Sequence, residues 1–398
     1  MLKEKKMLKW TILMIALFQM PALAVSPSIS GIMENFPGHS LKTVQTLLQL
    51  PNLISPFVAL FTAFVSRLLK ERSSKKRDIV AGLSLLFLTA LGVAFVHTAF
   101  WNLYIWGAVL GISLGLFLPS TTGMMVALFN EKERRVLTGQ QTAFINGGGI
   151  MMSILGGLMA TTVWYGGYLV FFLSLPVILL CLKYLPDRNK MRTVARYEQY
   201  PQKTGYFNIN ILYYAAIIFL FMMTYSVSMS NMSVYIQDEL RIGDSATTGI
   251  ISAFGMGGGT VCGLFFGKIS SKFKDFILPF AFFILFVGFL INAFAHSLTI
   301  LIIGSVLLGS TISMVMSQCV FSISLYVNER SSGLATSIAM SVAPSLGGFV
   351  SPSIYTTVTM LIKDTISFRY LFTGLVSLGL SVILLLLTLL RKKRGLTS

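Results

Sequence analysis

The feature that most constrains this chain is a series of about twelve long apolar runs of roughly 20 residues each. A helix of that length spans a hydrocarbon core of about 30 Å. Lipid offers no partners for free backbone groups, and the runs lack a period-two alternation, so they must be helices. The runs are 8–32, 41–66, 79–98, 101–128, 138–161, 163–184, 208–236, 245–267, 276–295, 298–327, 333–361 and 369–390.

The composition agrees with a chain that lies in a membrane. Hydrophobic residues make up 55% of the 398 residues, and charged residues only 11%, against about 25% charged residues in soluble domains. The sequence therefore predicts an all-α membrane protein with twelve transmembrane helices and the lipid bilayer as its surroundings.

The first run resembles a secretory signal peptide. Basic residues precede it, and Ala22-Leu23-Ala24 resembles a cleavage site. The apolar stretch continues past that site to Ile32, and eleven further runs follow, so we expect a retained first helix.

Placing the charges on the runs explains the net charge of +17. All but four of the 31 Lys and Arg residues fall on one side, the exceptions being Lys42, Arg241, Lys363 and Arg369. This asymmetry predicts a multi-pass protein of the cytoplasmic membrane with both termini in the cytoplasm. No nucleic-acid recognition motif is present, so we expect no nucleic-acid partner.

The chain is a doubled unit. Small residues four apart at 55–67 recur at 255–267, AFVHT (94–98) recurs as AFAHS (293–297), and Asn130-Glu131 recurs as Asn328-Glu329, all at an offset of about 200 residues. We therefore predict a six-helix bundle over 1–185, a cytoplasmic linker over 186–207 and a second bundle over 208–398.

Six plus six helices with a basic central loop resemble the major facilitator superfamily. That family carries G-x-x-x-D-R-x-G-R-R/K between helices 2 and 3. Here the pattern falls on 67–76, with Glu71 at the acidic position and Arg67 where the first glycine would stand. The second half keeps Gly267 and Lys272 but no acid. The resemblance implies two pseudo-symmetric bundles and transport by alternating access.

Two further signatures of the family are partial. Exporters often carry G-x-x-x-G-P-x-x-G-G in helix 5, and this chain has Gly148, Ser153 and Gly156-Gly157 without the central Gly-Pro. The arginine usual in helix 4 is replaced by Gly107.

Rows of small residues four apart have two interpretations, close helix packing and smooth faces that let the halves slide.

One such row, Gly111-Ile-Ser113-Leu-Gly115, also matches the nucleophile elbow of hydrolases. That motif needs a strand, a sharp turn and a helix, whereas here it lies inside an apolar helix. We therefore expect no enzyme activity.

Charges inside the runs are the expected markers of proton or ion pathways. All fourteen acids, and the Lys and Arg residues, fall in predicted loops or at helix ends. We infer a substrate that is neutral, zwitterionic or amphipathic. Glu34, just past the first run, is the one weak candidate for proton transfer, with a solvated loop residue as its alternative. The sequence implies no cofactor and no metal, and leaves coupling to a proton gradient open.

Uncharged polar residues share helical faces and could line a substrate cavity, or could equally form hydrogen bonds between helices. These candidates are Gln19, Ser26, Ser30, Gln45, Gln49, Asn52, Asn146, Thr224, Ser228, Asn231, Tyr235, Met314 and Gln318.

The resemblance also implies a cytoplasmic latch. In the family the loop acid lies near the start of helix 11, here around Ser331–Gly333, where the helix dipole favours a carboxylate. The residues assigned to this latch are Arg67, Glu71, Arg72, Lys75, Gly267 and Lys272.

Together these features predict a monomeric secondary active transporter that exports a small molecule. The alternatives are uptake or facilitated diffusion of a small metabolite, and a non-transporting sensor or lipid-scrambling module.

Overall fold

The computed structural model describes residues 2–68, 75–129, 131–186, 209–326 and 342–393. Contacts divide the chain into two units: Met1–His39 with Leu47–Gln202, and Ser40–Thr46 with Lys203–Ser398. The predicted linker, 186–207, lies outside the described residues except for its first position, so it stays a prediction. The predicted first bundle included residues 40–46, whereas the structure groups these residues with the second unit.

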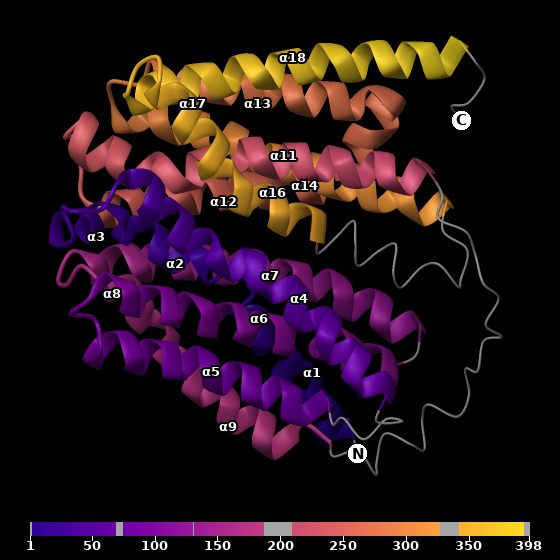
Figure 1. Ribbon diagram of the computed structural model, residues 1–398. Coiled ribbons are helices and arrows are strands. Elements are labelled where there is room, and N and C mark those ends of the chain that lie inside the picture. The colour runs from indigo at the N-terminus through magenta and orange to yellow at the C-terminus, as the bar shows by residue number, and fades with distance from the viewer. Residues whose placement is uncertain (1, 69–74, 130, 187–208, 327–341, 394–398) are drawn as a thin grey trace. The chain divides into compact units, whose positions relative to one another are not determined.

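The first unit consists of helices and short 3-10 turns. They are α1 (Leu2–Ala16), α2 (Ala22–Val25), η1 (Ser26–Ser28), α3 (Ile29–Asn35), α4 (Leu41–Leu68), α5 (Lys75–Phe95), α6 (Phe100–Leu128), α7 (Glu131–Ala160), α8 (Gly166–Leu169), η2 (Val170–Leu173) and α9 (Ser174–Tyr184). The first six residues of α4 fall in the second unit. Within the first unit α5 packs along α6, and α2 packs on α7 (Figure 1).

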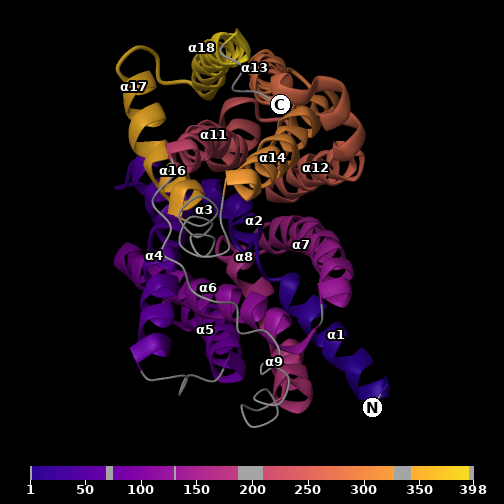
Figure 2. The same ribbon diagram turned by 90° about the vertical axis from the view of Figure 1, so that its right-hand side faces the viewer.

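The second unit is also helical throughout its described residues. It contains α11 (Ile209–Val234), η4 (Tyr235–Glu239), α12 (Ser245–Phe273), η5 (Lys274–Phe276), α13 (Ile277–Ala293), α14 (Leu298–Tyr326), α16 (Ala343–Ser351), η7 (Pro352–Thr356), α17 (Thr357–Met360) and α18 (Ile366–Lys393). Figure 1 shows α13 beside α18, and Figure 2 shows α12 beside α14.

The predicted spans match these helices with two exceptions. Among the described residues, nine stretches are long and apolar enough to cross a membrane, and one of them, Ser245–Ala293, contains both α12 and α13. The run predicted as a continuous helix over 8–32 is instead interrupted after Ala16. Pro21 is the N-cap residue of the short α2, where its missing N–H costs nothing, and Pro27 lies in η1. The run at 333–361 is described only from 342 onward.

The glycine rows lie where helix backbones touch. A Cβ added at Gly111 would come within 2.7 Å of the Ile54 side chain, and one at Gly115 within 2.6 Å of the Ser55 carbonyl oxygen. In the second unit, a Cβ at Gly309 would collide with the Gly255 carbonyl oxygen. These contacts support the packing interpretation, in which small residues let helices approach closely without a hydrophobic drive.

Helix α12 begins with a capping box. The Asp244 carboxylate accepts hydrogen bonds from the Thr247 backbone N–H and hydroxyl, both at 2.8 Å, and the Thr247 hydroxyl accepts from the Asp244 N–H at 3.3 Å. The backbone hydrogen bond from Thr247 lowers the pKa of the Asp244 carboxyl below its usual value. The cap therefore favours the ionised acid.

We expect Asp244→Ala to destabilise the folded protein by about 1 kcal/mol at pH 7, because α12 would lose its cap. Since the pKa of Asp244 is lowered on folding, its ionisation stabilises the protein above the unfolded pKa of about 3.9, and this contribution is lost as the pH falls through the folded pKa. Asp244→Asn keeps a cap acceptor that does not titrate. Unfolding temperatures of wild type and both variants between pH 3 and 7 measure this, and identical pH profiles for wild type and Asp244→Asn would contradict it.

Candidate functional site

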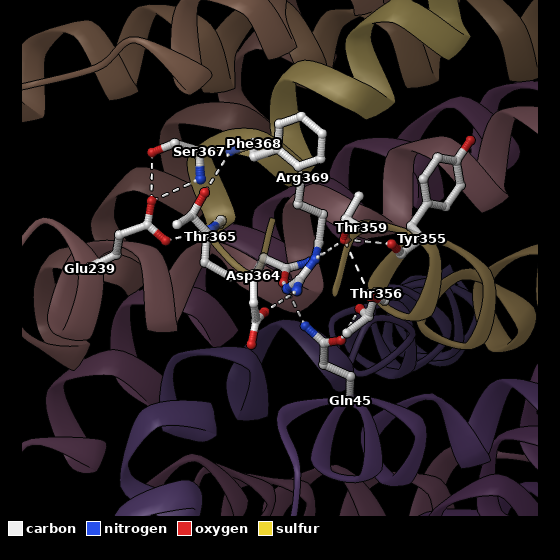
Figure 3. A network of polar contacts seen from close by, with 12 residues as sticks. Gln45, Glu239, Tyr355, Thr356, Thr359, Asp364, Thr365, Ser367, Phe368 and Arg369 are labelled. Carbon is white, nitrogen blue, oxygen red and sulfur yellow. Dashed lines mark hydrogen bonds and ion pairs between the residues drawn. The ribbon is translucent and has the colours of Figure 1, made fainter. Parts of the chain in front are cut away.

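The candidate site is a buried polar network in the second unit, centred on helix α11 (Figure 3). Apolar residues surround it, so each polar group there needs a partner. The predicted helical face supplies Thr224, Ser228 and Asn231 of α11 and Tyr235, the first residue of η4, and all four are buried. The side chains of Asn231 and Tyr235 bond to other helices, and these two residues connect the network.

Asn231 is the central acceptor. Its Nδ2 donates to the Val227 carbonyl at 2.7 Å within α11, which turns Oδ1 away from its own helix. That oxygen accepts from Gln45 Nε2 at 2.7 Å and from Arg369 Nη1 at 2.5 Å. One amide oxygen therefore holds two donors from different segments.

Gln45 lies near the start of α4, in the short segment that groups with the second unit, and is fully buried. Its Nε2 also donates to the Ser230 carbonyl at 2.9 Å, and its Oε1 accepts from the Thr356 hydroxyl at 2.7 Å. These bonds fix which end of the amide is nitrogen, and they explain why residues 40–46 depart from the predicted boundary.

Arg369 lies in the first turn of α18 and has no exposed surface. Its Nε donates to the Thr359 hydroxyl at 3.1 Å, and its Nη2 donates to Asp364 Oδ1 at 3.3 Å. The Thr359 hydroxyl donates onward to the Tyr355 carbonyl at 2.7 Å, which leaves its lone pairs for the guanidinium. Figure 3 shows Arg369 between Thr359 and Asp364.

The sequence placed Arg369 at a helix end, as the first residue of the run 369–390, and the structure has it in the first turn of α18. That position did not predict that Arg369 is buried. Asp78, in the first turn of α5, is also buried. The sequence did carry a signal, because Asp364 and Thr365 are typical residues for the start of a helix, and the arginine follows them within one turn.

Glu239 caps α18 from a distant part of the chain. Its carboxylate accepts hydrogen bonds from the backbone N–H groups of Ile366 and Ser367, the latter at 2.9 Å, and from the Ser367 hydroxyl at 2.5 Å. An anion suits the free N–H groups and positive dipole end of a long helix. Glu239 reaches this place because η4 is a single turn of π-helix, in which the Leu240 N–H bonds to the Tyr235 carbonyl at 2.8 Å.

Tyr235, Thr224 and Ser228, the other residues of the predicted face, differ in what they bond to. The Tyr235 hydroxyl donates to the Asn292 carbonyl at 2.7 Å and accepts from the Ser367 hydroxyl at 3.4 Å. The Thr224 hydroxyl bonds only within α11, to the carbonyls of Leu220 and Phe221. The Ser228 carbonyl accepts from the Tyr370 hydroxyl at 3.5 Å.

The other cavity candidates of the N-terminal half belong to the first unit. Ser26 and Ser30 are buried in η1 and α3, whereas Gln19 and Asn146 are half-buried. Gln49 and Asn52 bond to each other along α4, at 2.5 Å between Nδ2 of Asn52 and Oε1 of Gln49.

Met314 and Gln318 lie on α14. Met314 is buried, and Gln318 accepts from the Ser270 hydroxyl of α12 at 3.3 Å and donates to the Ser322 hydroxyl at 3.3 Å. Between the same two helices lies an apolar cavity of about 510 Å³. Its lining consists of Phe254, Gly257, Gly258, Val261, Cys262, Phe265, Ile269, Val306 and Ser310.

Most of the predicted latch cannot be placed. Glu71, Arg72 and their expected contact at Ser331–Gly333 lie outside the described residues, as does the side chain of Arg67. Lys75 donates to the Gly123 carbonyl at 2.6 Å. Gly267 has open space where a Cβ would stand, and Lys272 is exposed.

The structure also shows where Glu34, Ser113 and the cysteines lie. Glu34 is exposed near the end of α3. Ser113 lies within α6, and its hydroxyl donates to the Gly82 carbonyl at 2.7 Å, as a packing residue would. Cys181, Cys262 and Cys319 are buried free thiols. Within the described ranges, no group of three or more His, Cys, Asp or Glu residues could hold a metal ion.

The family comparison decides the class of protein. The sequence profile of the Major Facilitator Superfamily matches residues 10–352, and matches again over 214–397. The chain belongs to the Major Facilitator Superfamily. It is therefore an all-α, multi-pass membrane transporter and not an enzyme.

Solved structures agree on the fold. A bacterial homologue of the human lysosomal transporter Spinster, in an inward-facing and unoccupied conformation, is 13% identical with a TM-score of 0.66, covering 97% of this chain and 95% of that one. Tetrameric PepTSo2 is 15% identical with a TM-score of 0.73, covering 99% and 100%. At these identities the likeness shows the fold alone.

Among curated proteins, the methyl viologen resistance protein SmvA of Salmonella typhimurium is 29% identical over 129 residues. The match covers 31% of this chain and 26% of SmvA. The chain therefore spans about a quarter of the length of this relative.

We expect Asn231→Leu to destabilise the protein by about 1–3 kcal/mol, because it leaves donors of Arg369 and Gln45 without their shared acceptor in a buried site. Thr224→Val is the matched control on the same helix, since the Thr224 hydroxyl bonds only within α11. Thermal unfolding of the detergent-purified variants measures both. Equal losses for the two variants would show that the network adds nothing beyond ordinary packing.

Proposed function

We propose that this protein is a secondary active transporter that exports a small amphipathic molecule across the cytoplasmic membrane. The observation that carries the direction of transport is the glycine row of α7, at the position of the exporter signature. A Cβ at Gly148 would collide with the backbone of Leu17, and one at Gly156 with the backbone of Ala24. Close, smooth contacts of this kind allow helices to shift against each other at little cost in packing.

The relative supports the same direction. SmvA is named for resistance to methyl viologen, and export of a compound is a direct route to resistance against it. Only a stretch of 129 residues is shared, so the proposal takes from SmvA the direction of transport and not its compound.

Transport would follow alternating access, in which two bundles of helices rock about a central site. We propose that both termini lie in the cytoplasm, because of the asymmetry in the placement of Lys and Arg. We also propose a monomeric transporting unit and coupling to the proton gradient. No resident cofactor is part of the proposal. Three described acids with buried or network positions, Asp78, Glu239 and Asp364, join Glu34 as places where a coupling proton could bind.

Cells that overproduce the protein should tolerate higher concentrations of its substrate than cells that lack it. Inside-out proteoliposomes with an imposed pH gradient test the same idea directly, because an exporter coupled to protons accumulates substrate only while the gradient lasts. A panel of amphipathic compounds, including methyl viologen, should contain at least one whose uptake collapses when the gradient is dissipated. Altered growth on a nutrient without any change in resistance would favour uptake, and no flux of any compound would exclude a transporter of such molecules.

The glycine contact gives a sharper test with adjacent residues of α7. We expect Gly148→Ala to reduce transport strongly, because its methyl group would push α7 away from Leu17. Gly147→Ala should transport normally, since open space surrounds the position of its Cβ. Initial rates in proteoliposomes, corrected for the amount of folded protein, compare the two. Equal rates would remove the glycine row as an argument for export.

A further inference from the structure

Arg369 keeps binding capacity that the network does not use. A guanidinium carries five N–H donors in a fixed plane. Three of them bond to described residues: Asn231, Thr359 and Asp364. The two remaining N–H groups, one on each Nη atom, have no bond to any described residue, although the side chain is completely buried.

The charge of Arg369 is poorly matched by its surroundings. Its acceptors on Asn231 and Thr359 are neutral. The partner of opposite charge, Asp364, is bound through one oxygen at 3.3 Å, and its side chain is 61% exposed. A buried cation is stabilised most by a carboxylate that accepts two parallel N–H bonds. Asp364 makes only one of these bonds and remains largely in solvent.

The guanidinium is nevertheless held rigidly. Thr359 is fixed by the Tyr355 carbonyl, and Asn231 is fixed by Val227 and Gln45. The start of α18, which carries Arg369, is fixed by Glu239. Donors that are already oriented lose little entropy when they bind a ligand.

We propose that Arg369 binds the carboxylate of the transported molecule, and that Asp364 occupies this position when no substrate is bound. The substrate is then an organic acid or a zwitterion with one carboxylate, because the group it displaces is a single carboxylate of unit charge. Its two oxygens accept the free Nη hydrogens and take over the bond now made to Asp364. This inference rests on the proposed function and changes the expectation of a neutral, zwitterionic or amphipathic substrate to that of a substrate with a carboxylate.

Asp364 is the part of this site that meets solvent. Its side chain is 61% exposed and contacts the buried Nη2 of Arg369. In the proposal the substrate carboxylate takes the place of this side chain, while the buried bonds to Asn231 and Thr359 stay as they are.

Benzoate and benzamide provide the first test, since they differ in charge and hardly in shape. The purified full-length protein should bind benzoate at least about tenfold more tightly than benzamide, as one charged hydrogen-bonded pair provides. Arg369→Gln should remove this preference. Lys363→Gln, at an exposed cation next to Asp364, should retain it. Equal affinities for benzoate and benzamide in the wild type would overturn the proposal.

Asp364→Ala keeps the proposal testable even if Arg369→Gln fails to fold. Removing an exposed side chain should leave the fold intact and the guanidinium without its counter-ion. Formate should then raise the unfolding temperature of Asp364→Ala by more than that of the wild type, whose own carboxylate competes. Chloride at equal concentration serves as the ionic-strength control. A variant that responds no more to formate than the wild type does would contradict the proposal.

Failure of this inference can be told apart from failure of the proposed function. The binding measurements need no flux, so a preference for benzoate in a protein that transports nothing would support the site and remove the transporter proposal. Export of a neutral compound at the same rate by wild type and Arg369→Gln would support the transporter and overturn the site.

Discussion

The burial of one guanidinium group determines the arrangement of the polar residues in the second unit. Moving an arginine out of water costs several kcal/mol unless its donors find acceptors. The acceptors come from α11, from the segment that precedes α18, and from the region of α17, so these elements must meet at one place. The amide of Gln45 and the hydroxyl of Thr356 are then oriented in turn by hydrogen bonds that begin at Arg369.

The helices were predictable because their cause is local. A run of about 20 apolar residues has few alternatives to a helix in lipid. The interruption of the run 8–32 shows where that reasoning fails, since a hydropathy count does not tell a proline at a break, such as Pro21, from prolines inside a continuous helix, such as Pro51 and Pro56 in α4. The boundary at residues 40–46 fails for a different reason, because Gln45 finds its partners some 185 to 311 residues away in the sequence.

The site was predicted in part. Helical spacing placed Asn231 and Tyr235 on one helical face, and both lie in the network, Asn231 in α11 and Tyr235 in η4. The same spacing also selected Thr224, whose hydroxyl bonds only to its own helix. Arg369 was missed because sequence position marked it as a helix end, and a helix end can lie in solvent or in protein. Glu239 was missed because no local sequence pattern indicates that this acid caps a helix that begins 127 residues later.

The π-helical turn at Tyr235–Glu239 has a consequence for how this region tolerates insertions and deletions. Such a turn holds one more residue than an α-helical turn over nearly the same rise and rotation. Loss of one residue within it would therefore restore an ordinary helix and leave both Asn231 and Glu239 close to their present directions. Loss of one residue from the α-helical stretch between Asn231 and Tyr235 would instead rotate the carboxylate of Glu239 by about 100° relative to Asn231, and the start of α18 would lose its cap. The link between Arg369 and the cap of α18 thus tolerates a one-residue change in chain length inside the π-helical turn and does not tolerate one just before it.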